Sequence, residues 1–334
     1  MSNMPALGFE RSTRNKIVPL PALVKPTGGG LTQQELPKSG LLARLWLQIS
    51  ITTAGTITTQ NALGACSAIK RVRVLTNSGI DIFNCSGAGF FYLLQNAQEL
   101  EGVNGRQPKN QGNSTLVTAT SYNLDMVIPI MLNLHDALGL LLTQNEQLQI
   151  ILSVEWESDV NVILTGGGTL TGTCTPRMEF FTVPADPRSY PPLNVIHQII
   201  EDQVGIPSAA DYIYNFPRGN VYLQALFGAG INAAPADSWT RLILRVNQSD
   251  ILYDFTPGHL DQRVGFFGNL TRGLGQVPVD LLGSDGMGAY GSARDFINSA
   301  LLTDFQAVIT PTGAITLYVI RRMLMPLAEP LIPH

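Results

Sequence analysis

The residues closest to a catalytic arrangement are two glutamates that flank a tryptophan. Glu155 and Glu157 stand on either side of Trp156, and the i, i+2 spacing places both carboxylates on one face of a strand. Two carboxylates about 5–9 Å apart could cleave a glycosidic bond. The alternative is a solvent-facing or intersubunit strand face, where neighbouring carboxylates are common. This weak pair alone therefore does not predict catalysis.

Few groups in the chain could hold a metal ion or a phosphate. The four histidines lack a spacing that gathers ligands, and no Cys-x-x-Cys pair exists. Asp280 and Asp285 lie in a segment that could form a weak cation-binding turn, although a plain turn is the expected alternative. The triple glycines at 28–30 and 166–168 are not followed by Lys-Ser or Lys-Thr. The sequence predicts no catalytic residue, no cofactor, no metal site and no enzyme.

The composition is unusually poor in charge. Of 334 residues, 45% are hydrophobic and 14% are charged, whereas about 25% charged is usual. We interpret this as an outer surface largely buried against copies of the same chain; the alternative is a Gly- and Thr-rich β protein with a polar, uncharged surface. A net charge of −4 argues against a protein that coats nucleic acid.

The cysteines and the apolar runs bear on the cellular compartment. Cys66, Cys85 and Cys174 are too few for a disulfide framework and suit a reducing compartment. The first residues lack a basic segment followed by an apolar core, so no signal peptide is expected. The longest apolar stretch, 126–142, is interrupted by polar residues, whereas a membrane span takes about 20 apolar residues.

Proline and glycine divide the chain. Residues 1–35 are rich in both and carry the basic residues Arg11, Arg14 and Lys16, so we predict an extended arm laid over a neighbouring surface, with one edge strand at 17–21; the alternative is a disordered tail. Four prolines within 184–192 predict a stiff linker at 184–195. The predicted domains are therefore 36–183 and 196–325, followed by an extended tail at 326–334.

Between these segments the sequence reads as strands. Leu45 and Leu47 point to one side of a strand while Arg44 and Trp46 point to the other. The segment 52–63 predicts a β-ribbon, 265–291 a long loop, and 89–100 and 259–267 two short helices. Further strands are predicted at 69–75, 115–120, 124–131, 148–157, 160–164, 169–173, 177–183, 195–204, 239–246, 304–309 and 314–323.

One pattern occurs twice. Leu36-Pro37-Lys38 matches Phe216-Pro217-Arg218 at an offset of 180, and the Arg-containing strand 71–77 matches 241–247 at an offset of 170. A short helix follows the next strand in both halves. A repeat of this length indicates a duplicated domain. The fold class is therefore all-β, with two sandwiches in tandem.

The chain resembles the double jelly-roll major capsid proteins of tailless, icosahedral, membrane-containing bacteriophages. The resemblance is carried by the repeated segments, the proline-rich joint and the lack of predicted catalytic residues. The resemblance covers roughly residues 36–325. It implies two tandem eight-stranded jelly-roll β-sandwiches, each with a short helix. It also implies a structural protein whose pseudo-hexagonal homotrimers tile an icosahedral shell.

The resemblance further implies a place in the virion, with assembly in the host cytoplasm. The implied partners are other copies of the chain, minor capsid and vertex proteins, and an inner viral membrane. The basic arm with Arg11, Arg14 and Lys16 would face anionic lipid or the packaged genome without sequence-specific binding.

Two other classes compete with the capsid reading. A carbohydrate-binding or glycan-cleaving double jelly roll, such as a spike or a hydrolase, would need an aromatic-lined cleft with clustered carboxylates. Only 155–157 approaches such a cleft. An outer-membrane barrel is disfavoured by the lack of an expected signal peptide and by the two short helices.

Overall fold

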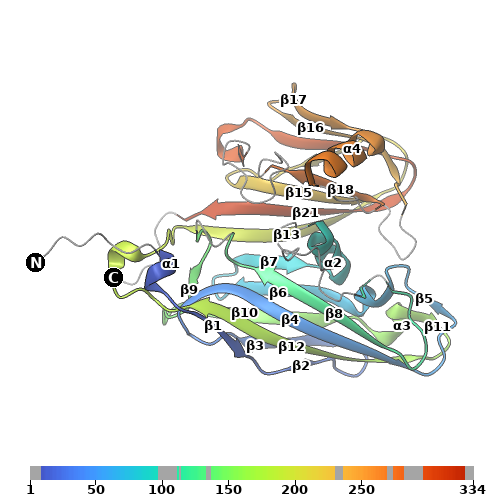
Figure 1. Ribbon diagram of the computed structural model, residues 1–334. Helices are drawn as coiled ribbons and strands as arrows, with labels where there is room; N and C mark the ends of the chain where they lie inside the picture. Colours follow the sequence, from blue (N-terminus) through green and yellow to red (C-terminus); the bar gives the residue numbers. More distant parts are fainter. Residues whose placement is uncertain are drawn as a thin grey trace, which may run out of the picture.

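Two β-sandwiches, each closed around an apolar core, make up the computed structural model (Figure 1). The structure describes residues 9–96, 111–112, 114–132, 137–229, 236–268, 274–281 and 296–327. Among these residues, no helix is both long enough and apolar enough to cross a membrane.

The first sandwich faces a sheet of order β1-β12-β4-β8 against strands of order β7-β6-β10-β3. Two short strands, β2 and β9, add to β12 and β4. The strand bounds are β1 Asn15–Pro19, β2 Leu23–Val24, β3 Gly30–Glu35, β4 Leu41–Ala54, β6 Ile69–Thr76, β7 Asp81–Cys85, β8 Ser121–Pro129, β9 Leu141–Leu142, β10 Ile150–Trp156 and β12 Thr169–Phe181.

The second sandwich faces strands of order β13-β21-β15-β18 against a sheet of order β14-β20-β16-β17. The short strand β19 adds to β15. The strand bounds are β13 Val195–Ile206, β14 Tyr212–Asn215, β15 Val221–Ala229, β16 Trp239–Val246, β17 Asp250–Phe255, β18 Gln276–Asp280, β19 Ile297–Asn298, β20 Phe305–Pro311 and β21 Ile315–Pro326.

The two halves repeat one topology. In chain order β1, β3, β4, β6, β7, β8, β10 and β12 occupy the places that β13 to β18, β20 and β21 occupy in the second half. Each half has one helix after its fifth strand: α2 (Gly87–Asn96) after β7 and α4 (Pro257–Gly268) after β17. Even the β-bulge recurs, after Val74 in one hairpin and after Leu244 in the other. The predicted duplication is confirmed.

Strand alternation explains where the cores lie. On β4, Leu45, Leu47 and Ile49 are 0–2% exposed and point between the sheets of the first sandwich. Residues one position away point outward, because successive side chains of a strand alternate between the two faces. Trp156 and Trp239 are the largest side chains buried in the first and second cores, respectively.

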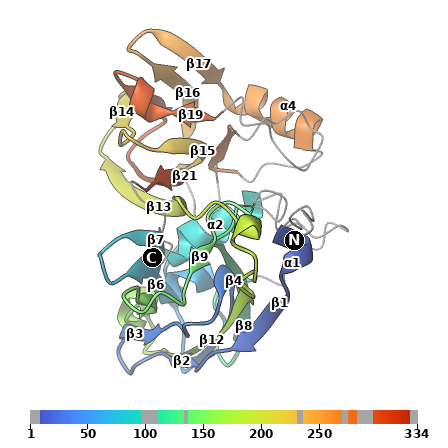
Figure 2. The ribbon, with the colours of Figure 1, turned by 90° about the vertical axis from the view of Figure 1, so that its left-hand side faces the viewer.

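The sandwiches are joined by a parallel strand pair. Phe83 of β7 lies beside Ile199 of β13, and Asn84 lies beside Ile200, so that one nine-stranded sheet runs through both sandwiches. Helix α2 lies at this junction and contacts both β15 and β21 of the second sandwich (Figure 2).

The remaining elements are α1 Phe9–Ser12, β5 Thr59–Gln60, η1 Gly64–Ala68, α3 Asp159–Val162, β11 Ile163–Thr165, η3 Pro187–Ser189 and η5 Ser299–Leu301.

The segment predicted as an arm differs from expectation. Instead of lying free over a neighbour, residues 15–35 pair within the first sandwich, β1 and β2 with β12 and β3 with β10. These strands are short and largely exposed, with the burial of an edge. The edge strand predicted at 17–21 corresponds to β1 at 15–19, whereas β3 has little apolar alternation and was not predicted. The other proposed domain boundaries stay predictions, and the tail beyond residue 327 lies outside the described residues.

Three further sequence predictions are wrong. No strand forms at 115–120, where the side chain of Tyr122 accepts a hydrogen bond from Val117 N at 2.6 Å. Residues 160–162 form the end of α3, and only 163–165 form strand. Within the predicted loop 265–291, β18 buries Val277 and Val279 completely or nearly so.

The predicted break between two strands near residue 175 is also absent. Strand β12 continues through Pro176, whose carbonyl accepts a hydrogen bond from Leu20 N at 3.0 Å. The nitrogen and the carbonyl of an antiparallel residue point to the same neighbour. The missing N–H of Pro176 therefore faces the gap between β1 and β2, and the ladder to β4 is unaffected.

Candidate functional site

The predicted carboxylate pair does not form one site. Glu155 Oε1 accepts a hydrogen bond from Lys70 Nζ at 2.6 Å. Glu157 follows the end of β10 and accepts from Asn161 Nδ2 at 2.8 Å, near the start of α3. Trp156 between them is 2% exposed and donates to Thr32 Oγ1 at 3.0 Å. Each glutamate thus has a separate structural partner, and the tryptophan belongs to the core.

The electrostatics of Glu157 agree with a structural role. Burial by itself would raise the pKa of this carboxyl, but hydrogen bonds from Asn161 and Ser158, together with the charge of Lys70, lower it below its ordinary value. A general acid needs a pKa raised toward the working pH. Glu157 is shifted in the opposite direction.

The predicted cation turn is not assembled by the structure. Asp280 is the last residue of β18 and lies opposite Gln224, while Asp285 falls outside the described residues. Among the residues that the structure describes, no cluster of three His, Cys, Asp or Glu side chains could hold a metal ion. His197 is buried and His259 is exposed, and the other two histidines lie outside the described ranges.

The basic residues of the first segment are exposed beside one end of the first sandwich. Arg11 lies in α1, Arg14 precedes β1, and Lys16 lies on β1. The backbone N of Arg14 donates to Thr182 Oγ1 at 2.9 Å, which holds this segment against the end of β12. The backbone that carries the three cations is therefore attached to the first sandwich.

A buried carboxylate organises the outward side of the same sheet. Glu179 is 3% exposed. It accepts hydrogen bonds from Trp46 Nε1 at 2.7 Å, Asn15 Nδ2 at 2.7 Å and Arg44 at 3.2 Å. Because burial of a charge requires such partners, Glu179 ties β1, β12 and β4 together.

Solvent-exposed apolar side chains lie on the same sheet face as this carboxylate. We call the surface formed by Ile17, Trp46, Arg177 and Glu179, on the side of β1-β12-β4 away from the core, the first outer face. Ile17 is 55% exposed and Trp46 is 38% exposed. Exposed apolar residues on one sheet face are characteristic of an interaction surface.

The corresponding surface of the second sandwich is covered. We call Ile199, Leu226 and Ile320, on the side of β13-β21-β15 away from the second core, the second outer face. All three are at most 2% exposed and belong to the cluster that contains the side chains of α2. The same kind of sheet surface is thus buried in one half of the chain and open in the other.

Polar groups seal the covered face at its edge. Glu201 of β13 is 2% exposed and accepts from Ser86 N at 2.6 Å and from Gln203 Nε2 at 2.6 Å. Burial raises the pKa of this carboxyl despite these hydrogen bonds and the charge of Arg71. Arg71 donates to the backbone carbonyl of Glu201 at 3.3 Å. These contacts hold the start of α2 against the second sandwich.

Two further contacts are made by buried arginines of β21. Arg322 Nε donates to His197 Nε2 at 2.9 Å, and burial together with this cation lowers the pKa of His197 well below its ordinary value. Arg321 pairs with Asp202 at 2.9 Å, and Asp202 also accepts a hydrogen bond from Tyr214. Both networks link neighbouring strands, which indicates a structural role for these charges.

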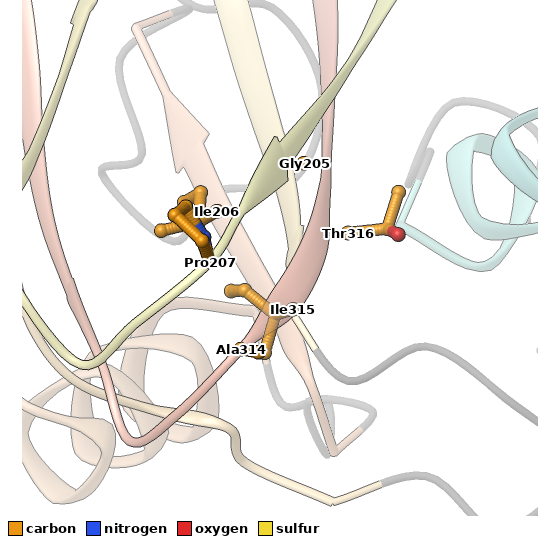
Figure 3. A pocket seen from close by; sticks show the side chains of 6 residues that line it. All are labelled: Gly205, Ile206, Pro207, Ala314, Ile315 and Thr316. Carbon is orange, nitrogen blue, oxygen red and sulfur yellow. The ribbon is translucent and has the colours of Figure 1, made fainter.

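An open hollow lies where β13 ends and β21 begins (Figure 3). It is lined by the residues Gly205, Ile206, Pro207, Ala314, Ile315 and Thr316. None of these side chains titrates, and Thr316 is the only polar one. The hollow therefore offers no acid, base or charged ligand for catalysis.

Three solved structures show what this architecture is similar to. The major capsid protein of Sulfolobus turreted icosahedral virus matches over 94% of this chain and 97% of its own, with a TM-score of 0.69 and 14% identity. The chain has the double jelly-roll fold. The PBCV-1 virus capsid matches over 96% and 98% with a TM-score of 0.62 and 11% identity. The major capsid protein of bacteriophage PM2 matches over 95% of this chain and 99% of its own, with a TM-score of 0.55 and 10% identity.

No protein-family model matches this double jelly roll, and no curated protein matches it in sequence. At 10–14% identity the likeness to the solved structures establishes the fold. The predicted fold class is confirmed.

The first outer face was missed at the level of sequence, although part of its signal was present. The alternation in β4 already directs Trp46 away from the core, beside Arg44. A tryptophan on the polar side of a strand indicates a contact surface. The sequence predicted an edge strand at 17–21, which overlaps β1. It did not predict that this strand pairs with residues 177–181, more than 150 positions away.

Proposed function

We propose that this chain is a major capsid protein, a structural subunit that forms pseudo-hexagonal trimers and tiles an icosahedral viral shell. The observation that carries the proposal is the match of both jelly rolls, over more than 90% of each chain, to capsid proteins of three viruses. A match of this extent supports a common use of the whole two-sandwich unit rather than of one domain.

The duplicated architecture suits such a role. Two sandwiches of one topology present nearly repeated surfaces, so three chains offer six similar units to a lattice. A head-to-tail contact that closes on itself forms a ring. A trimer with a pseudo-hexagonal outline is the ring that three such chains would form.

The buried charges favour a structural protein over an enzyme. Glu179, Glu201, Arg321 and Arg322 each contact a partner on another strand or segment of the same chain. Their partners join strands rather than line a cleft. The glycan-binding alternative lacks support, since the carboxylates at 155 and 157 are separately engaged.

We further propose that the subunit resides in the virion after assembly in the host cytoplasm, over an inner membrane and in contact with minor capsid and vertex proteins. The exposed cations Arg11, Arg14 and Lys16 support an electrostatic contact with anionic lipid or packaged nucleic acid. All three cations lie at one end of the first sandwich, where Arg14 N bonds to Thr182. This end of the subunit would therefore face the lipid or the nucleic acid.

The central test is whether the purified chain assembles. Size-exclusion chromatography with light scattering should give three times the 36.1 kDa chain mass, and negative-stain microscopy should show hexagonal plates or shells. A protein that stays monomeric at every concentration and forms no plates or shells would contradict the proposal.

The basic segment has its own test. Replacing Arg11, Arg14 and Lys16 together by Gln should leave trimers intact and weaken the binding of trimers to vesicles of anionic lipid, in proportion to the lost charge. Arg218→Gln, at an exposed position in the second half of the chain, is the matched control. Equal vesicle binding by both variants would refute the role of the segment in membrane contact.

A further inference from the structure

The two halves of the chain differ in what lies over their equivalent faces. Strand pairing outward from β4 and β15 gives three of the four residues of the first outer face a counterpart on the second. The matched pairs are Ile17 with Ile199, Trp46 with Leu226, and Arg177 with Ile320. Ile199 and Leu226 are each 1% exposed, whereas Ile17 is 55% and Trp46 is 38% exposed.

The elements that do the covering are also duplicated. Strand β7 and helix α2 cover the second outer face, and their counterparts are β17 and α4. Both helices begin with the same device: Gly89 N bonds to Ser86 Oγ at 3.0 Å, and His259 N bonds to Thr256 Oγ1 at 3.4 Å. These residues correspond at the offset of 170.

The counterparts cover less within their own chain, where Leu260 of α4 packs into the second core. Most of β7 is buried, but five of the six residues of β17 are exposed or half-buried. Ile82 on β7 is 1% exposed and its counterpart Leu252 is 42% exposed, next to Ile251 at 58%. Strand β17 is the free edge of its sheet, as β1 is of its own.

We propose that β17 and α4 of one copy cover the first outer face of a second copy, with β17 running parallel to β1 as β7 runs parallel to β13. This inference rests on the proposed self-assembly and specifies its surfaces. One chain cannot make the contact alone, because β17 and β1 lie at opposite ends of the molecule in both views (Figure 1, Figure 2).

The contact inside the chain specifies the register between chains. Phe83 lies beside Ile199, and Asn84 lies beside Ile200. Transferring both pairs to their counterparts places Tyr253 beside Ile17, and Asp254 beside Val18. Two free strand edges are thereby paired, which removes the exposed backbone groups that promote aggregation. The contact is head-to-tail and closes in a ring.

The contact between chains is more polar than the one inside the chain. Where α2 has Phe91 and Tyr92, both buried, α4 has Asp261 and Gln262, both exposed. Burial inside a chain takes place during folding and is permanent. A subunit must stay soluble before it assembles, so the surface that later contacts another copy needs polar groups.

Cysteine cross-linking of the full chain tests the predicted register. A variant with both Ile17→Cys and Tyr253→Cys places the two thiols of neighbouring copies on adjacent strands, within the span that a disulfide requires. On mild oxidation it should give covalent trimers that a reductant separates. The native Cys66 and Cys174 are buried with pKa values raised to about 12 by that burial, and burial also raises the pKa of Cys85, so these thiols react poorly.

The controls separate the inference from the proposed function. The pair Ile17→Cys and Leu301→Cys uses a side chain 82% exposed on a different surface, and Ile17→Cys alone tests for a symmetric contact. If trimers or particles form but the 17–253 pair links no better than the control pair, the inference is wrong and the capsid proposal stands. Cross-linking by Ile17→Cys alone would also overturn it. A chain that forms neither trimers nor particles would overturn both.

Charge insertion gives a second measurement without cysteines. Ile17→Asp and Leu252→Asp change side chains that are exposed in the single chain, so neither should disturb folding. Each should weaken trimer association about tenfold or more, a change of about 1.4 kcal/mol. Leu301→Asp and Val160→Asp, at positions 82% and 73% exposed, should leave association unchanged. Equal effects of all four variants would refute the assigned surfaces.

Discussion

Individual buried charges hold neighbouring segments together through hydrogen bonds, and Glu201 is an example. Its carboxylate accepts hydrogen bonds from Ser86 and Gln203 at the junction of the two sandwiches. Removing such an acceptor leaves buried donors without a partner, which costs more than the hydrogen bond itself contributes.

Glu201→Ala should therefore lower the free energy of unfolding by about 2–3 kcal/mol. The matched control is Glu155→Ala, because Glu155 pairs with Lys70 at a distance of 2.6 Å while both side chains are partly exposed. Exposed pairs contribute about 0–1 kcal/mol. Chemical denaturation of the two variants compares them directly, and a loss at Glu201 no larger than at Glu155 would contradict the role of the junction.

His197 predicts a pH dependence with a definite sign. Burial and the nearby Arg322 lower its pKa well below the ordinary 6.5. Below pH 6.5 the unfolded chain binds a proton that the folded chain does not, so the free energy of unfolding falls as the pH falls. The contribution is at most about 1.4 kcal/mol per pH unit.

His197→Gln should remove this contribution. Denaturation of the parent and the variant between pH 7 and pH 5 should show a shallower decline for the variant. His259→Gln replaces an exposed histidine and serves as the control. Identical slopes for the parent and His197→Gln would show that the imidazole gains its proton in the folded chain.

At the scale of elements, the sequence predicts long strands well and edges poorly. Strand β16 lies where alternation placed it, and α2 and α4 begin within two residues of their predicted starts. The edge strands β3 and β14 were missed, because half-exposed strands of four to six residues carry little apolar periodicity, whereas β1 corresponds to the edge strand predicted at 17–21. Their existence depends on partners more than 90 residues away in the chain.

The first outer face was likewise only partly predictable, because local alternation places some of its residues and long-range strand pairing places the others. The outward direction of Trp46 follows from local alternation, whereas Ile17 comes to lie on the same sheet face only through the pairing of β1 with β12. The duplicated Arg-containing strands were visible in the sequence. The helices after them differ in residue type, since α2 has Phe91 and Tyr92 where α4 has Asp261 and Gln262. The face that α2 covers is nevertheless a property of the assembled sandwiches.

The two helices differ in how closely they approach the neighbouring sandwich, which predicts opposite effects of one substitution. A Cβ at Gly89 would meet Glu201 Oε2 at 2.0 Å, whereas a Cβ at Gly258 of α4 meets nothing within 4 Å. Gly89→Ala should destabilise the chain, and Gly258→Ala should stabilise it by up to about 1 kcal/mol through helix propensity. Thermal unfolding of both variants tests this. Equal tolerance at the two sites would contradict the close contact at α2.

At the scale of the whole molecule, the low charge content has a structural explanation. An exposed sheet face with Ile17 and Trp46, and a free strand with Ile251 and Leu252, are surfaces that a permanently monomeric protein normally avoids. In the proposed lattice of subunits these surfaces would be interior. The composition is then that of a molecule whose final surface forms only on assembly.

Tryptophan fluorescence can follow this burial. Trp156 and Trp239 are at most 2% exposed, and Trp46, at 38%, is the third and last tryptophan. Quenching by acrylamide should therefore decrease as the protein concentration rises and Trp46 becomes covered. In Trp46→Phe the quenching should be low at all concentrations. A parent protein whose quenching is the same in the monomer and the trimer would show that Trp46 stays in solvent.

Cryo-electron microscopy of the purified full-length chain tests the central claim most directly. The account predicts a ring of three chains and six sandwiches, in which α4 of each chain lies over the β1-β12-β4 face of the next, as α2 lies over β13-β21-β15 within each chain. Particles of a single chain, or trimers in which Ile17 and Trp46 face solvent, would contradict it.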